Sequence, residues 1–166
     1  MKEFKKGVNK EGEEMRKIVL VLGILLVIAM VLPVMAVPAV EKATGGGFYK
    51  FGDAQFVKSF TAQKDANGVV KGQWQGQSRP TWGTWHADVT ELKVVSNKAF
   101  IGGVIRSADP DSPIVIGTKV CMIVVDNGQG KGAVDQMTAT YSGDMDLCAN
   151  LFNPTFYDFT GNIQVN

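Results

Sequence analysis

Alternating apolar and polar residues fill the chain after residue 46, in short runs separated by tight-turn signals. Each of three turn signals joins two such runs: Asn67-Gly68 joins residues 54–64 to 69–77, Ser96-Asn97 joins 88–95 to 98–106, and Asp126-Asn127-Gly128 joins 117–125 to 133–141. Asn and Gly are favoured there because they tolerate the positive φ that a tight hairpin requires. The pattern therefore predicts three β-hairpins.

A first strand at residues 47–51 and a last one at 158–165 bring the predicted total to about eight strands. No helical periodicity of useful length follows residue 40. Sequential hairpins with short links form an antiparallel up-and-down meander, which protects its edges by closing into a barrel or by folding into two packed sheets. We predict an all-β barrel, with a two-sheet β-sandwich as the alternative, because Gly72 and Gly102 lie within strands and permit the bends that closure requires.

Alternation within the strands identifies the side chains that face the core. The predicted core consists of Phe56, Phe60, Ala62, Val70, Trp74, Ala99, Ile101, Ile105, Val120, Met122, Val124, Met137, Ala139, Tyr141, Ile163 and Val165. The strand around Cys121 is apolar on both faces, because Cys121, Ile123 and Val125 alternate with the inward set. We therefore expect the loop at residues 144–153, which carries Cys148, to cover its outer face.

An uncharged apolar run at residues 18–40 precedes the strands and directly follows Arg16 and Lys17. A signal peptide has a basic start, an apolar helix and small residues before its cleavage site, and Val34 and Ala36 supply the small residues. We predict a hydrophobic signal helix that is cleaved after Ala36. Because the positive charges precede the run, the folded part is expected outside the cytoplasmic membrane.

The chain thus divides into a predicted signal peptide at residues 1–36, a flexible linker at 37–46 and a single β-domain at 47–166. Cleavage after Ala39 and an uncleaved membrane anchor are the alternatives, since the run is long enough to span a bilayer core of about 30 Å. Residues 1–14 mix Lys with Glu, which is unusual ahead of a signal helix. They are either a disordered extension or a mis-assigned start, with Met15 as the true initiator.

Charge excludes two classes of partner for the β-domain. Residues 37–166 carry 11 Lys or Arg and 12 Asp or Glu, a net charge of about −1. A near-neutral domain without basic clusters lacks the electrostatic footprint of a nucleic-acid binder, and it also lacks the polybasic segments that attract anionic lipids. We therefore expect no nucleic acid, and membrane association only if the N-terminal segment stays uncleaved.

Cys121 and Cys148 are the only cysteines of the chain. An even cysteine count in an exported protein favours a disulfide. Closing this loop would contribute about 3.5 kcal/mol on the chain-entropy account. The alternative is two unpaired thiols, because spacing along the chain does not show how far apart the α-carbons lie.

Several short patterns occur in one order along the chain: Gly45-Gly46-Gly47-Phe48, residues 60–65 before Gly68-Val69-Val70-Lys71-Gly72-Gln73, Trp85-His86-Ala87, Asp126-Asn127-Gly128 and Gly161-Asn162-Ile163-Gln164-Val165. This order resembles a group of uncharacterised secreted β-domains of bacterial and archaeal exported proteins, sometimes found behind a choice-of-anchor domain. The resemblance covers most of residues 45–166 and implies a β-fold and export. It implies no activity. The chain departs from the group in its cysteine pair and in the longer stretch at residues 141–158.

Three tryptophans, Trp74, Trp82 and Trp85, lie within twelve residues, beside Arg79 and His86. Exposed indole rings can stack on the apolar faces of sugars or hold a small ligand at the mouth of a barrel. Indoles also fill cores, because they bury a large area. The cluster is therefore either a ligand-binding rim or part of the core.

Two further sets of residues offer weaker chemistry. Asp126, Asn127 and Asp135 surround a glycine-rich turn and carry the oxygen ligands that calcium prefers, although an ordinary Asp turn explains them equally. His86 and Asp88 point to the same side of a strand, but no nucleophile motif accompanies them, so no catalytic residue is predicted. Apart from calcium, no cofactor is expected.

These patterns predict an exported, non-catalytic β-domain with a structural or binding role at the cell envelope or outside the cell. The alternative is a carbohydrate- or small-ligand-binding module that uses the tryptophan-rich rim, with a glycan or another envelope component as its partner. A hydrolase is the third hypothesis.

Overall fold

The computed structural model describes residues 39–79, 83–110, 112–129, 132–151 and 153–166. The predicted signal peptide, its cleavage after Ala36, the proposed start at Met15 and Trp82 all lie outside the described residues. Within the described part of the chain, no helix is long and apolar enough to cross a membrane.

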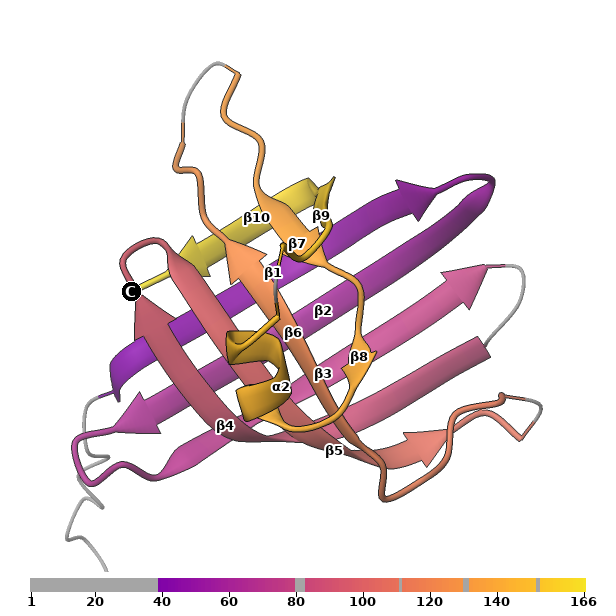
Figure 1. The fold of residues 1–166 in the computed structure, drawn as a ribbon, viewed down its shortest axis with the longest axis horizontal. Coiled ribbons are helices and arrows are strands. Elements are labelled where there is room, and N and C mark those ends of the chain that lie inside the picture. Colours follow the sequence, from indigo (N-terminus) through magenta and orange to yellow (C-terminus); the bar gives the residue numbers. More distant parts are fainter. Residues whose placement is uncertain (1–38, 80–82, 111, 130–131, 152) are drawn as a thin grey trace, which may run out of the picture. The chain divides into compact units, whose positions relative to one another are not determined.

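The described residues form one antiparallel sheet that is nearly closed into a barrel. Its strands are β1 (Ala39–Phe51), β2 (Ala54–Asp65), β3 (Val70–Arg79), β4 (Gly83–Val95), β5 (Lys98–Ala108), β6 (Lys119–Val125), β7 (Gln136–Thr138), β8 (Tyr141–Ser142), β9 (Phe156–Asp158) and β10 (Thr160–Val165). They are hydrogen-bonded in the order β10-β1-β2-β3-β4-β5-β6-β7-β9, with β8 beside β6 (Figure 1). The predicted all-β barrel is confirmed. The two-sheet sandwich is wrong, because one continuous sheet curls around the core.

Two of the predicted tight turns are present, at residues 66–68 between β2 and β3 and at 96–97 between β4 and β5. Gly68 and Ser96 both adopt positive φ there. The third prediction is wrong in detail, because β6 ends at Val125 and β7 begins only at Gln136. The connection after Val125 is therefore longer than predicted, and its carboxylates accept hydrogen bonds from backbone N–H groups of the loop and of β10.

The segment predicted as a flexible linker, residues 37–46, is a strand from Ala39 onward, because β1 pairs with both β2 and β10. Its glycines serve close packing. A Cβ built on Gly45 would lie 2.5 Å from the ring of Phe60, and one on Gly47 would lie 2.3 Å from the carbonyl oxygen of Thr160. The glycine run therefore lets an aromatic ring and a neighbouring backbone approach this strand closely.

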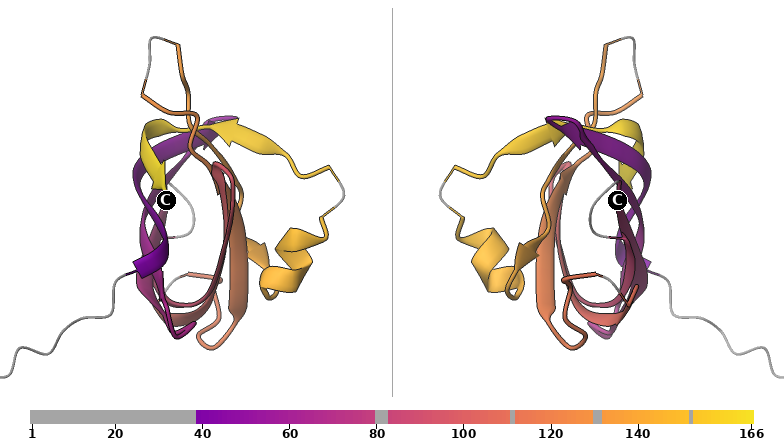
Figure 2. Two further views of the ribbon diagram at one scale, coloured as in Figure 1. Left: turned by 90° about the vertical axis from the view of Figure 1, so that its left-hand side faces the viewer. Right: turned by 90° about the vertical axis from the view of Figure 1, so that its right-hand side faces the viewer.

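Two carboxylates of the β6–β7 loop bind the free edge of β10, the last strand of the nearly closed sheet that Figure 2 shows from two sides. β10 pairs with β1 along one edge, and its other edge presents the backbone N–H groups of Ile163 and Val165. Ile163 donates to Oδ2 of Asp135 at 2.7 Å, and Val165 donates to Oδ2 of Asp126 at 3.0 Å. These side chains take the place of a neighbouring strand and leave the edge less open to pairing with another chain.

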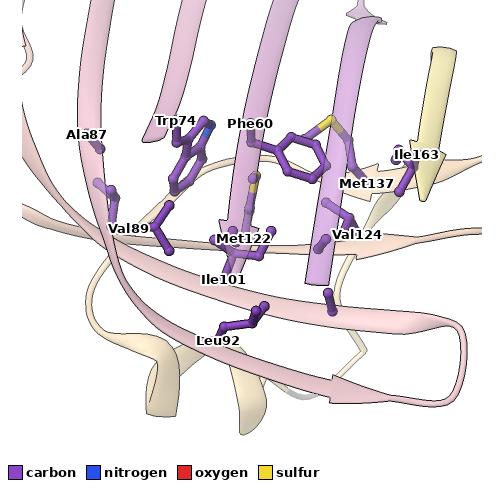
Figure 3. Close-up of a cluster of buried hydrophobic side chains, with 14 of the residues drawn as sticks. Phe60, Trp74, Ala87, Val89, Leu92, Ile101, Met122, Val124, Met137 and Ile163 are labelled. Carbon is purple, nitrogen blue, oxygen red and sulfur yellow. The ribbon is translucent and has the colours of Figure 1, made fainter. Parts of the chain in front are cut away.

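The barrel interior is filled mainly by the side chains that alternation predicts, and Figure 3 shows Phe60, Trp74 and Met122 among them. The same cluster also contains Ala87, Val89 and Leu92 of β4, which were not predicted. Most of the predicted core is buried in this cluster, while Phe56, Val70 and Val165 are only partly buried against it. Tyr141 differs from the prediction, because it packs outside the barrel, against the cluster around Cys121. The short strand β8 turns its ring to that side.

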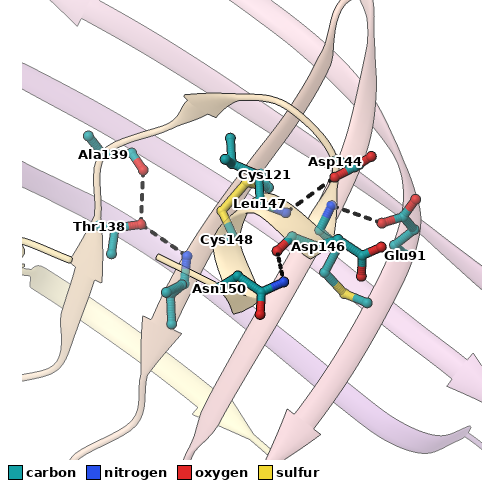
Figure 4. Close-up of a disulfide and its surroundings, with 11 residues drawn as sticks. Glu91, Cys121, Thr138, Ala139, Asp144, Asp146, Leu147, Cys148 and Asn150 are labelled. Carbon is teal, nitrogen blue, oxygen red and sulfur yellow. Dashed lines mark hydrogen bonds between the residues drawn. A yellow bond between two sulfur atoms is a disulfide. The ribbon is translucent and has the colours of Figure 1, made fainter. Parts of the chain in front are cut away.

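The disulfide prediction is confirmed, and the bridge holds a short helix against the outside of the barrel (Figure 4). Cys121 on β6 bonds to Cys148 on α2 (Met145–Ala149), with the α-carbons 6.1 Å apart. The helix begins where Asp144 accepts a hydrogen bond from the backbone N–H of Leu147, as an N-cap residue does. It replaces part of the loop predicted at residues 144–153 and covers the apolar outer face of β6 as expected. The bridge is consistent with an extracellular location, where disulfides persist.

Candidate functional site

One end of the barrel contains a cavity of about 500 Å³. This end carries the β1–β2 turn and the β5–β6 loop, at the right of Figure 1. The lining side chains come from β1 to β6, from β9, and from the segments at residues 113–118 and 139–142. Cavities of roughly 300–1,000 Å³ are the usual size of small-ligand sites in proteins.

Lys58 lies at the buried side of this cavity because strand alternation turns it inward. It occupies the middle of β2, between Phe56 and Phe60, and successive inward positions of a strand are two residues apart. Its side chain is only 3% exposed. The same alternation that builds the apolar core thus places a lysine inside the barrel.

The Lys58 amine has two kinds of contact inside the barrel. Nζ donates a hydrogen bond of 2.9 Å to Oγ1 of Thr140, which lies between β7 and β8. Nζ also lies 4.5 Å from the centroid of the Trp85 ring and 5.8 Å from that of Trp74. An ammonium group over an indole face gains a cation–π attraction. The amine is therefore held in place by one hydroxyl and two aromatic rings.

No carboxylate of a described residue forms an ion pair with Lys58, although Lys64 and Arg106 each have one. Burial disfavours the charged form of an amine, because the interior solvates it less well than water does. Desolvation accordingly lowers the pKa of Lys58 from its ordinary value to about 7. This shift brings the titration of the amine close to neutral pH.

Stacked aromatic rings form one wall of the cavity. The ring of Tyr49 lies 5.1 Å from that of Phe56 and 4.9 Å from that of Tyr157, and both pairs are nearly parallel. Phe51 meets Tyr157 edge-on at 5.9 Å. Burial raises the pKa of the Tyr49 hydroxyl well above its usual range, with Tyr157 and Tyr141 adding to the effect. Tyr49 therefore stays neutral and adds apolar surface to the wall.

The side chains that line the cavity are exposed and apolar at its mouth, and the amine of Lys58 lies buried at its inner end. Phe51 and Val115 line it and are 63% and 68% exposed, whereas Lys58 is almost fully buried. Beyond Lys58, Phe60 and Trp74 fill the barrel and belong to its buried core. The cavity is thus a pocket with one cationic group at depth and apolar side chains at its entrance.

Trp85 is positioned by a glycine on the neighbouring strand. Gly76 on β3 pairs with Trp85 on β4, and a Cβ built on Gly76 would lie 2.3 Å from the indole. The indole therefore packs against the Gly76 backbone, and the amine of Lys58 lies over the ring. Gly76 is one position where the absence of a side chain shapes the site.

The structure brings together only part of the predicted ligand-binding set. Trp74 and Trp85 meet edge-to-face at 5.1 Å, but they are 1% and 4% exposed, so they form no open rim. Trp85 lines the cavity. Arg79 ends β3 as an exposed residue, and His86 lies one position after Trp85, on the outer side of β4. Asp88, predicted beside His86, faces Arg106 at 3.5 Å.

In the predicted calcium site, the carboxylate oxygens accept hydrogen bonds from backbone N–H groups. Besides binding β10, Asp135 accepts from the backbone N–H of Asn127 at 2.9 Å, and Asp126 accepts from that of Gly128 at 2.8 Å. Asn127 donates its amide to the carbonyl oxygen of Val134. Among the residues that the structure describes, no group of three or more His, Cys, Asp or Glu side chains is arranged to hold a metal ion.

Sequence reasoning missed Lys58, although the signal was present. The alternation that assigned Phe56, Phe60 and Ala62 to the core assigns Lys58 to the same face. A lysine at an inward position is a buried polar group, which is the informative exception in a core pattern. The cavity itself leaves no such signal, because it depends on how several distant loops are arranged.

No family model, no curated protein and no solved structure matches this chain.

Proposed function

We propose that the barrel binds a small, mainly apolar molecule in the cavity that ends at Lys58, and that it does so as an exported, non-catalytic module outside the cytoplasmic membrane. The observation that carries the proposal is a cavity of about 500 Å³ with an aromatic wall and one buried amine, which forms no ion pair with a carboxylate of the described residues. Mostly apolar pockets with a few placed polar groups are typical of small-ligand sites.

An apolar ligand fits this geometry better than a sugar. A sugar-binding rim needs exposed rings and many hydrogen-bonding groups, whereas the indoles of Trp74 and Trp85 are buried and the wall around Tyr49 is aromatic. The apolar side chains at the mouth, Phe51 and Val115, favour entry of an apolar molecule from outside the barrel. The disulfide supports export, since oxidising compartments preserve such bonds.

We expect the purified protein to bind the neutral, apolar fluorophore N-phenyl-1-naphthylamine with one saturable site. Fluorescence of the dye should rise and shift to the blue, because the cavity replaces water around it. Replacing Ala139 with phenylalanine places a ring in the cavity that Ala139 lines. The variant should weaken binding by about tenfold or more, since the new ring occupies part of the space that the dye needs.

A matched control introduces the same ring outside the barrel. Ser59 follows Lys58 on β2 and is exposed, so Ser59→Phe should leave the dissociation constant of the dye within about twofold. Absence of saturable dye binding by the unmodified protein would contradict the proposal. Equal loss of binding in both variants would do so as well, because the cavity would then not be the site.

A further inference from the structure

We infer that the ligand of this cavity carries a single carboxylate on an apolar body, and that the carboxylate pairs with the amine of Lys58. The inference rests on the proposed function and adds the chemical class of the ligand. Its starting point is a juxtaposition: a lysine that is 3% exposed, in a cavity to which no described residue contributes a negative charge.

A buried charge without a partner is costly, and natural proteins pair such groups or neutralise them. Lys58 has a hydroxyl and two indole faces as its neighbours, but these offer only partial charges. An anionic ligand group would supply the missing counter-charge. Hydrogen bonds between an ammonium and a carboxylate are shorter and stronger than those between neutral groups.

The charge count favours a monoanion. Lys58 is the one cationic side chain among the described residues that line the cavity. A doubly charged phosphate would leave one negative charge unpaired in the same buried space, which is unfavourable. A carboxylate matches the amine one to one. Thr140 accepts from the amine and carries a hydroxyl hydrogen of its own, which can donate to a carboxylate oxygen.

The direction of the cavity fixes the orientation of the ligand. The amine lies at the buried side, and exposed apolar residues, Phe51 and Val115, lie at the mouth. A carboxylate at Lys58 therefore places the apolar body along the aromatic wall of Tyr49, Phe56 and Tyr157. The far end of a long ligand would reach the mouth.

This pairing links binding to proton uptake, because a carboxylate favours the charged amine. In the free protein the pKa of Lys58 is about 7, so binding above that pH must first protonate the amine. Affinity for a carboxylic acid is then roughly constant between about pH 5, below which the ligand itself becomes neutral, and about pH 7, and it falls by up to about tenfold per pH unit above that. The other titratable lining residues that the structure describes are Tyr49 and Tyr157, from β1 and β9, while β3 to β6 and the loops contribute none.

The test compares laurate with dodecanol, which has the same chain length and no charge, as competitors of N-phenyl-1-naphthylamine. We expect laurate to displace the dye more tightly than dodecanol at about pH 6. Its dissociation constant should rise by about tenfold or more between about pH 6 and pH 9, while that of dodecanol stays within about twofold. A preference for laurate that does not change with pH would show that the amine stays charged across this range, and the pairing then rests on the variant Lys58→Met. No preference for laurate at about pH 6 overturns the inference.

The substitution Lys58→Met removes the amine while leaving the rest of the cavity in place, so it tests the contribution of the charge alone. Laurate binding at about pH 6 should weaken by about 10- to 100-fold, the usual worth of a hydrogen bond to a charged group, whereas dodecanol binding should change little. Lys71→Met, an exposed lysine on β3, is the matched control and should change neither. Unaltered laurate binding by Lys58→Met, with dye binding retained, overturns the inference but leaves the proposed function standing. If the unmodified protein binds neither the dye nor either competitor, both the inference and the proposed function are overturned.

Discussion

Replacing Lys58 with methionine is expected to raise the free energy of unfolding at neutral pH by about 1–4 kcal/mol, the range seen when well-packed apolar residues replace buried ion pairs. The unfolded chain exposes the amine to water, where its pKa is ordinary, while burial in the barrel lowers the pKa to about 7. Each unit of that difference corresponds to about 1.4 kcal/mol that the folded state loses by burying the amine. Methionine fills a similar volume without this cost. Loss of the hydrogen bond to Thr140 offsets part of the gain.

The pH dependence of this difference has a definite sign. Between the folded pKa of about 7 and the ordinary lysine value, the unfolded state binds more protons than the folded state, so the stability of the lysine-containing protein rises with pH. The advantage of Lys58→Met should therefore be largest below about pH 7 and shrink steadily toward pH 10. Urea unfolding of both proteins across this range measures it, with Lys71→Met as the control that should stay within about 0.5 kcal/mol. A variant that is less stable than the parent, or a difference independent of pH, would contradict a buried, uncompensated amine.

A residue that lowers stability where it stands is typical of a functional site. In this barrel the cost arises because Lys58 has no negatively charged partner among the described residues. A bound ligand that supplies a negative charge beside the amine would recover part of this lost stability. The stability effect and the carboxylate preference are thus two consequences of the same buried amine.

Removing the disulfide by the double substitution Cys121→Ala and Cys148→Ala is expected to lower the free energy of unfolding by about 3.5 kcal/mol. The bridge closes a loop with a sequence separation of 27 residues, and cross-linking restricts the unfolded chain by an amount that grows with loop length. The bridge also holds α2 over Ile123 and its neighbours, an apolar patch on the outside of β6. Losing it frees the helix to leave that patch exposed.

Urea unfolding with and without a reducing agent measures this effect. The reducing agent should destabilise the parent protein and leave the double variant unchanged, which serves as the control. Because the bridge lies outside the barrel, the dissociation constant of N-phenyl-1-naphthylamine should stay within about twofold while the variant is folded. A loss below about 1 kcal/mol would show that the helix and the short strands hold this face without the bridge.

The sequence was sufficient to predict the barrel because its main strands carry clear local signals. β2 and β3 alternate between inward and outward residues and are joined through Gly68 at positive φ, and β4 and β5 are joined in the same way through Ser96. Apolar residues on both faces of β6 also predicted that its outer side is covered. Each of these inferences needs only neighbouring positions, so a single sequence can carry it.

Features that depend on distant contacts were not predictable in this way. Asp126 and Asp135 resemble a turn or a metal set in sequence, but their partners are backbone groups of β10, more than 25 residues away. Gly45 resembles a linker residue in the sequence, whereas in the fold it lies against the ring of Phe60 on the neighbouring strand. The cavity beside Lys58 combines several strands and two loops, and no local pattern describes such a space.

The central claim is that the amine of Lys58 lies in a cavity that an apolar carboxylate fills. NMR of the lysine ε-CH₂ groups as a function of pH tests it most directly, with the Lys58 signal assigned from its absence in Lys58→Met. The account predicts that this signal titrates near pH 7 in the free protein and at least one unit higher in the protein saturated with laurate. A Lys58 signal that titrates near pH 10 in the free protein, or at the same pH with and without laurate, would contradict the account.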